Sequence, residues 1–226
     1  MPTWLHHLPI LTTVLAALFL VRLAQRYRTH PSTHLLWYAF GIATFGLGTA
    51  LESAITLAGN GPWLNKLWYA AGAVLGGYPL AQGTVHLLCA QRTARRLDFV
   101  TVPIVNVLVV LVLASPVVVS ELEPHRPTGA VLGWSWLRLM TPLVNGYAAL
   151  FLIGGAVLSA VRHGGVAGGR HRAVGNAAIA LGALLPGIGG AMAKGGVVEA
   201  LYVGELVGLA LIWWGYAQCV RPGADS

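Results

Sequence analysis

Three charged residues inside otherwise apolar segments are the first candidates for chemistry in this chain of 226 residues. Glu52, Arg138 and Glu205 each lie several residues inside a predicted helix, at a common depth of roughly 10 Å below one membrane boundary at 1.5 Å rise per residue. An isolated charge at that depth costs roughly 2.5 kcal/mol or more, so we expect the three to pair. A guanidinium can bind a carboxylate in a bidentate fork, and the surplus negative charge would attract a cation or a proton. The cluster predicts either an outward-facing site for a small ligand or ion, or a structural ion-pair network.

Further polar residues continue from this cluster along predicted helix faces. Residues three, four or seven positions apart share one face of a helix. On this spacing, Tyr78, Gln82 and Asn145 are predicted to line the deeper part of the site. His86 extends the same face and is interpreted as a hydrogen-bonded structural histidine, with a proton relay or a haem ligand as alternatives. Other accessory candidates are Lys66, Lys194 and Tyr202.

Seven hydrophobic segments must position these residues. The chain is 56% hydrophobic and only 9% charged, whereas soluble domains carry about 25% charged residues. A bilayer span needs roughly 20 apolar residues. We therefore expect an all-α bundle of seven transmembrane helices, forming a single domain over residues 1–226. The predicted helices cover residues 5–24, 34–58, 64–90, 99–119, 131–161, 173–193 and 197–220.

The basic residues alternate between the two ends of these helices, which predicts an orientation. Cytoplasmic loops carry an excess of Lys and Arg, so the richer side is assigned to the cytoplasm and the N-terminus to the outside. The same asymmetry accounts for the net charge of +7 without nucleic-acid binding, and we expect a multi-pass protein of the bacterial inner membrane. The richer side holds Arg22, Arg26, Arg28, Arg92, Arg95, Arg96, Arg162, Arg170, Arg172 and Arg221, and the other holds Lys66, Arg126, Arg138 and Lys194.

Motifs of known enzyme classes are missing from the sequence. It contains no G-x-S-x-G, H-E-x-x-H, Walker A or C-x-x-C pattern. No catalytic residue, cofactor or metal ligand is therefore assigned, although an enzyme acting on lipids stays an open alternative. Pro186, followed by Gly-Ile-Gly-Gly, predicts either a broken helix, as in transporters, or a simple kink with close packing.

Two stretches carry a family resemblance. LLWYAFGIATFGLGTALE and WLNKLWYAAGAVLGGYPLAQGTVHLL resemble the second and third helices of the seven-helix sensor region that precedes bacterial histidine kinases. The matching positions are Glu52, Lys66, Trp68 and Tyr69. No kinase domain follows Arg221 in this sequence, so the resemblance implies a stand-alone protein that acts through a separate signalling partner or as a homo-oligomer.

Together these patterns favour a membrane protein that binds a small ligand or ion in an outward-facing pocket, with a sensory role. The alternative is a small ion- or proton-coupled transporter or channel that uses the same charged residues.

Overall fold

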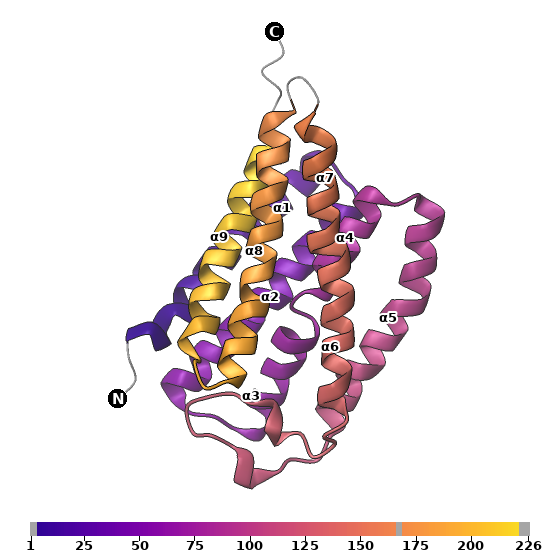
Figure 1. The fold of residues 1–226 in the computed structure, drawn as a ribbon. Coiled ribbons are helices and arrows are strands. Elements are labelled where there is room, and N and C mark those ends of the chain that lie inside the picture. Colours follow the sequence, from indigo (N-terminus) through magenta and orange to yellow (C-terminus); the bar gives the residue numbers. More distant parts are fainter. Residues whose placement is uncertain (1–3, 166–168, 222–226) are drawn as a thin grey trace. The chain divides into compact units, whose positions relative to one another are not determined.

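The computed structural model describes residues 4–165 and 169–221, and this part of the chain is helical without strands (Figure 1). Six helices are long and apolar enough to cross a bilayer, so the chain is an integral, multi-pass membrane protein in contact with lipid. The chain divides into two compact units, Pro9–Ala148 and Met1–Leu8 with Ala149–Ser226, which are described separately below. The candidate spans are Leu8–Thr29, Thr33–Ala58, Gln91–Ala114, Leu137–Gly164, Arg170–Ala193 and Glu199–Cys219.

Helices α1 (Leu8–Thr29) and α2 (Thr33–Ala58) begin the first unit and pack through small and hydroxyl-bearing residues. The hydroxyls of Thr13 and Thr49 are 2.9 Å apart and form a hydrogen bond between the helices. A Cβ atom on Gly46 would lie 3.0 Å from the Cβ of Ala16, so the two backbones approach closely at this point. Small residues and interhelical hydrogen bonds are the contacts that join helices in a bilayer, where the hydrophobic effect gives no help.

The third hydrophobic segment is interrupted, although one helix was predicted over residues 64–90. It consists of α3 (Pro62–Trp68), the π-helical η2 (Tyr69–Val74), a turn, and α4 (Tyr78–Leu88). Pro79 lies in the first turn of α4, where its missing backbone N–H would have no partner within the helix, so its position fits a new helix start at Tyr78. The Thr44 hydroxyl lies 3.3 Å from the Leu75 carbonyl oxygen beside the interruption, and it shares its single hydrogen between this oxygen and the Phe40 and Gly41 carbonyls of its own helix, each at 3.1 Å.

Helix α5 (Gln91–Ala114) begins earlier than the predicted span of residues 99–119. It also ends earlier, two residues before Pro116. The Lys66 ammonium donates to the Leu113 carbonyl at 3.0 Å, at the helix end that carries partial negative charge. Asn65 anchors the loop that follows, because its side chain accepts from the Thr128 amide and donates to the Thr128 carbonyl. This loop contains the short helices η3 (Val119–Glu121) and η4 (Gly129–Val131).

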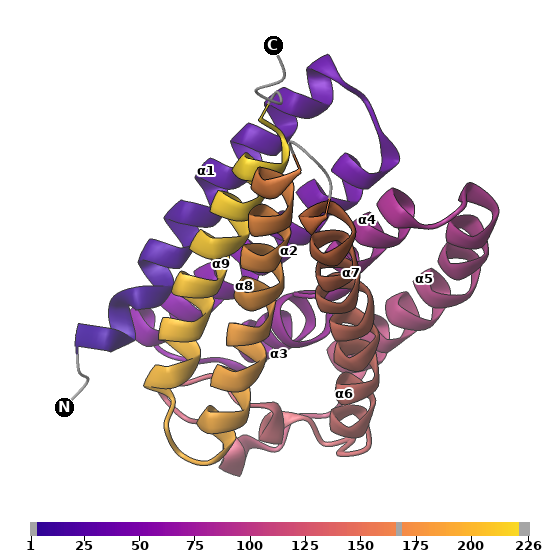
Figure 2. The same ribbon diagram turned by 45° about the horizontal axis from the view of Figure 1, so that its top comes forward.

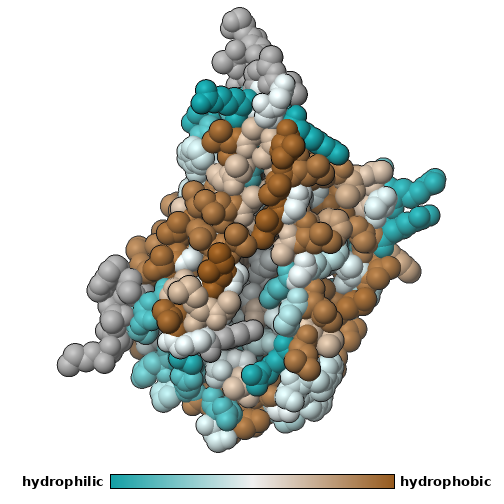
Figure 3. Space-filling model, viewed as in Figure 1, coloured by the Kyte–Doolittle hydropathy of each residue, from teal (hydrophilic) through white to brown (hydrophobic). Residues whose placement is uncertain are grey.

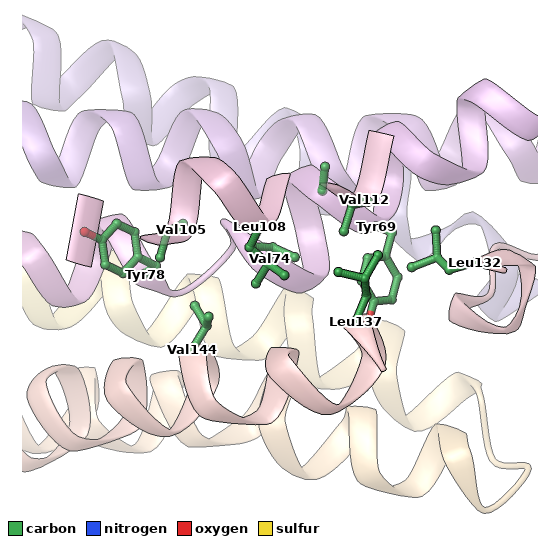
Figure 4. Close-up of a cluster of buried hydrophobic side chains, with 10 residues drawn as sticks. Tyr69, Val74, Tyr78, Val105, Leu108, Val112, Leu132, Leu137 and Val144 are labelled. Atoms are coloured by element: carbon green, nitrogen blue, oxygen red, sulfur yellow. The ribbon is translucent and has the colours of Figure 1, made fainter. Parts of the chain in front are cut away.

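Helix α6 (Leu137–Ala148) completes the first unit. It begins at Leu137 rather than at the predicted residue 131. Its apolar side chains join those of η2, α4 and α5 in one buried cluster (Figure 4). The α5 contribution recurs at Val105, Leu108 and Val112, a helical spacing that presents one face to the cluster. The remaining members are Tyr69, Ala70, Val74, Tyr78, Leu132, Leu137 and Val144.

The second unit contains the π-helical η5 (Ala149–Ile153), α7 (Gly154–Gly164), α8 (Arg170–Lys194) and α9 (Glu199–Cys219), with η1 (Trp4–His7) against α9. Helices α8 and α9 lie side by side in opposite directions (Figures 1 and 2). Helix α8 runs unbroken through Pro186, so the broken-helix interpretation of this segment is wrong and the interruption lies in the third segment instead. Apolar side chains cover much of the length of α7 and α8 (Figure 3).

Glycines spaced by seven residues bring the α8 and α9 backbones together. A Cβ atom would lie 2.6 Å from the Gly215 carbonyl oxygen if built on Gly175, and 2.5 Å from the Gly208 oxygen if built on Gly182. The same atom on Gly189 would lie 2.5 Å from the Ala200 oxygen. Since no real Cβ fits at these distances, the hairpin requires glycine on this face of α8.

Replacing Gly182 by Ala should therefore separate α8 from α9 and lower the free energy of unfolding by about 1–3 kcal/mol, as overpacking does elsewhere. The matched control is Gly187→Ala on the same helix, where a Cβ meets no atom within 4 Å. Because alanine is the better helix former, the control should be neutral or slightly stabilising. Thermal unfolding of the purified variants in detergent compares them, and equal midpoints for the two variants would contradict the packing account.

Candidate functional site

The strongest polar site in the described residues lies in the first unit and is centred on Asp98 of α5. The buried face of this helix contains Ala94, Val105, Leu108 and Val112. Asp98 belongs to the same helical stripe, so its carboxylate turns toward α4 rather than to the lipid. The Asp98 side chain is 27% exposed and the His86 side chain is 9% exposed, so Asp98 is the more accessible residue of the pair.

Two side chains of α4, one turn apart, hold the Asp98 carboxylate. The Gln82 amide donates to Asp98 Oδ1 at 2.6 Å, and His86 Nε2 lies 2.7 Å from Asp98 Oδ2. Each carboxylate oxygen therefore has its own partner, and these two contacts fix the orientation of the carboxylate. His86 Nε2 carries a hydrogen in this bond, either in the neutral imidazole or in the imidazolium.

Hydroxyl groups of α5 and α6 extend the network around Gln82. The Tyr147 hydroxyl donates to Gln82 Oε1, so both ends of this fully buried amide are bonded. The Tyr78 and Thr101 hydroxyls are 2.8 Å apart, and Gln82 Nε2 lies 3.4 Å from the Thr101 hydroxyl. A network with each member satisfied rigidifies its surroundings, because leaving any buried member unpaired would be costly.

Aromatic rings enclose the histidine. Trp37 of α2 stacks on the His86 imidazole with ring centroids 6.5 Å apart and planes 18° apart. Trp37 also meets the edge of Tyr78, whose ring lies 5.9 Å from that of Tyr147. His86 therefore lies between the face of the Trp37 indole and the Asp98 carboxylate. The arrangement can therefore bind a proton between an imidazole and a carboxylate in a largely apolar shell.

The structure brings together Tyr78, Gln82 and His86 from the predicted set, all on one face of α4. Asn145 is exposed on α6 and is not part of this network. Thr141, four residues earlier on α6, is buried and forms a hydrogen bond with the Tyr69 hydroxyl at 2.8 Å. The buried face of α6 is thus the one with Leu137, Thr141 and Val144, and Asn145 lies on another face.

The predicted cluster of Glu52, Arg138 and Glu205 is distributed over both units. Glu52 is buried in α2, and Arg138 is exposed at the second residue of α6, between exposed Trp136 and Leu139. Among the described residues, no salt bridge joins Arg138 to Glu52. Glu205 is half-buried in α9 of the other unit, where its Oε2 has no hydrogen-bond partner within the described chain. Ligand binding by these three residues stays a prediction.

The accessory candidates have separate places. Lys66 is buried, caps the end of α5 and lies 5.0 Å from the centre of the Trp63 ring. Tyr202 is buried in α9, with its ring 5.7 Å from that of His6. Lys194 is the last residue of α8, and its side chain lies outside the described part of the structure. Within the described residues, no group of three or more His, Cys, Asp or Glu could hold a metal ion.

Sequence reasoning missed Asp98, Thr101 and Tyr147. Asp98 follows Arg92, Arg95 and Arg96 directly and was placed outside the predicted span of residues 99–119. The signal that identifies Asp98 is helical spacing. Ala94, Asp98, Thr101 and Val105 recur every three or four residues, so they extend the buried face of the helix back toward its N-terminus.

No family model, no curated protein and no solved structure matches this chain.

Proposed function

We propose that this protein is a proton-responsive membrane protein whose sensing site is the His86–Asp98 pair. The observation that carries the proposal is the fixed contact of His86 Nε2 with Asp98 Oδ2 at 2.7 Å inside a helical unit. Ionisable side chains within membrane helices are costly and are functional candidates for that reason. Histidine changes charge near neutral pH, which makes it the usual switch in pH-responsive proteins. The resemblance to kinase-linked sensor regions supports a sensory role through a separate partner.

The charges that face His86 come from each neighbouring helix of the unit. Asp98 of α5 contacts the imidazole through its Oδ2, and Trp37 of α2 stacks on the imidazole ring. His34 of α2 is a second imidazole within electrostatic range of His86. The hydroxyls of Tyr78 and Tyr147 complete the surroundings through Thr101 and Gln82. Protonation of His86 would therefore place a positive charge against the Asp98 carboxylate, across the α4–α5 contact.

Stacking on Trp37 makes His86 observable by fluorescence, because an imidazolium quenches indole emission more than imidazole does. Purified protein in nanodiscs should lose Trp37 emission as pH falls between about pH 8 and 5. The chain has 8 tryptophans, so the Trp37 signal is taken as the difference between the wild type and Trp37→Phe. His86→Gln should abolish the transition in that difference. Asp98→Asn should alter the transition, since the imidazole loses the carboxylate that contacts its Nε2.

A transition that persists unchanged in His86→Gln would assign the proton to another group and contradict the proposal. Glu121→Gln is the control for Asp98→Asn, because Glu121 is an exposed carboxylate in the loop after α5 and should leave the transition where it is.

Coupled transport is the second candidate function, and the interrupted third segment favours it. Discontinuous helices place unwound backbone at the binding sites of many transporters. Here the interruption between η2 and α4 comes directly before Tyr78, the first residue of the polar network. A proton flux into liposomes that Asp98→Asn abolishes would favour a carrier over a sensor.

We further propose that the broken segment of residues 62–88 crosses the bilayer as a seventh span, in a bacterial inner membrane with the N-terminus outside. The excess of arginine at the predicted cytoplasmic ends supports this orientation. Outward access to Arg138 belongs to the same proposal, and the exposure of its side chain is compatible with access from that side.

Cysteine labelling tests orientation and access together, in a background in which Cys89 and Cys219 are replaced by Ser. In spheroplasts, a membrane-impermeant maleimide should label Arg126→Cys and Arg138→Cys but should label Arg95→Cys only after lysis. Labelling of Arg95→Cys in intact spheroplasts would reverse the orientation. Protection of Arg138→Cys from both sides would contradict an outward-open site.

A further inference from the structure

The start of α5 carries a second feature that the proton site does not explain. Arg92, Arg95 and Arg96 are exposed within one and a half turns, and the first turn contains no acidic residue. The nearest carboxylate in the sequence, Asp98, is bonded to Gln82 and His86. None of the three arginines forms a salt bridge in the described structure. Hydrophilic side chains project from this end of α5 (Figure 3).

These arginines share a helix face with apolar side chains. Arg92, Arg95, Arg96 and Phe99 follow a spacing of three, four and seven residues, which places them on one face. Phe99 is 84% exposed, and the apolar surface continues through Val100, Ile104 and Val107, which are all exposed. Within two turns, the exposed side chains on this face therefore change from three arginines to apolar residues.

A shallow surface pocket of about 650 Å³ lies over this boundary. It is lined by Gln91, Arg92, Arg95, Arg96, Phe99 and Val100, so guanidinium groups line one part and apolar side chains the other. Guanidinium groups bind phosphate oxygens in a planar, bidentate manner. Acyl chains beside Phe99, Val100 and Ile104 would remove those side chains from contact with polar head groups.

We infer that this face of α5 is a binding site for an anionic phospholipid, with its phosphodiester on Arg92, Arg95 and Arg96 and its acyl chains along Phe99 and Val100. Charge complementarity selects the anionic head group, since basic residues near a membrane surface attract anionic lipids strongly. The exposed apolar residues select a lipid over a free phosphate ion. The site is distinct from the proton site and does not depend on it.

Native mass spectrometry of the full chain in detergent tests the inference by titration with phosphatidylglycerol, phosphatidylcholine and inorganic phosphate. The wild type should bind phosphatidylglycerol at least tenfold more tightly than phosphatidylcholine. Substituting Arg92, Arg95 and Arg96 together by Gln should remove most of that preference. The matched control substitutes Arg22, Arg26 and Arg28 of α1 by Gln, which removes the same charge from another helix end and should keep the preference.

A second variant, Phe99→Ala, keeps all three guanidiniums and should weaken phosphatidylglycerol binding at least threefold. It also guards against a triple variant that fails to fold. Equal loss of preference in the α1 and α5 triple variants would overturn the site, because diffuse charge would then suffice. Displacement of phosphatidylglycerol by inorganic phosphate at comparable concentration, or no effect of Phe99→Ala, would overturn the assignment to a lipid.

Discussion

Polar groups buried away from water need hydrogen-bond partners within the protein, and this requirement determines how the helices of this structure pack. Asp98 sits in the helix that contributes the apolar stripe of Val105, Leu108 and Val112, and it is tolerated there because Gln82 and His86 each bond one of its oxygens. Gln82 in turn needs Tyr147, and these bonds connect α4, α5 and α6 at one level. Removing any member leaves another unpaired, so the network fixes the register of three helices as well as the position of a proton-binding pair.

The same requirement explains how the third hydrophobic segment can be broken. The Thr44 hydroxyl of α2 lies within hydrogen-bond distance of the Leu75 carbonyl beside the turn, and Lys66 of α3 donates to the Leu113 carbonyl near the end of α5. In the other unit, α8 and α9 are held by direct backbone approach at Gly182 and Gly208. Hydrogen bonds between polar side chains and close packing at glycine are both known solutions for helices in lipid.

Hydrophobic length and periodicity predicted the all-helical, membrane-spanning class and placed Tyr78, Gln82 and His86 on one face, because these depend on local sequence. The interruption at Leu75 and the partner of His86 depend on tertiary contacts and were not predicted. Asp98 was not singled out, because it lies one residue before the predicted span of residues 99–119, and its partners are two residues of the preceding helix. Conversely, Asn145 was expected inside because it is polar, and the structure places it on an exposed face of α6.

The central claim is that His86 and Asp98 act on each other inside the protein, and a double-mutant cycle measures this directly. His86→Ala, Asp98→Ala and the double variant are unfolded in lipid bilayers, and their free energies of unfolding are compared. A hydrogen bond to a charged group predicts a coupling energy of about 1.5–3 kcal/mol between the two sites. Additivity within about 0.5 kcal/mol would mean that the two side chains do not interact, and the proton site would be lost with that result.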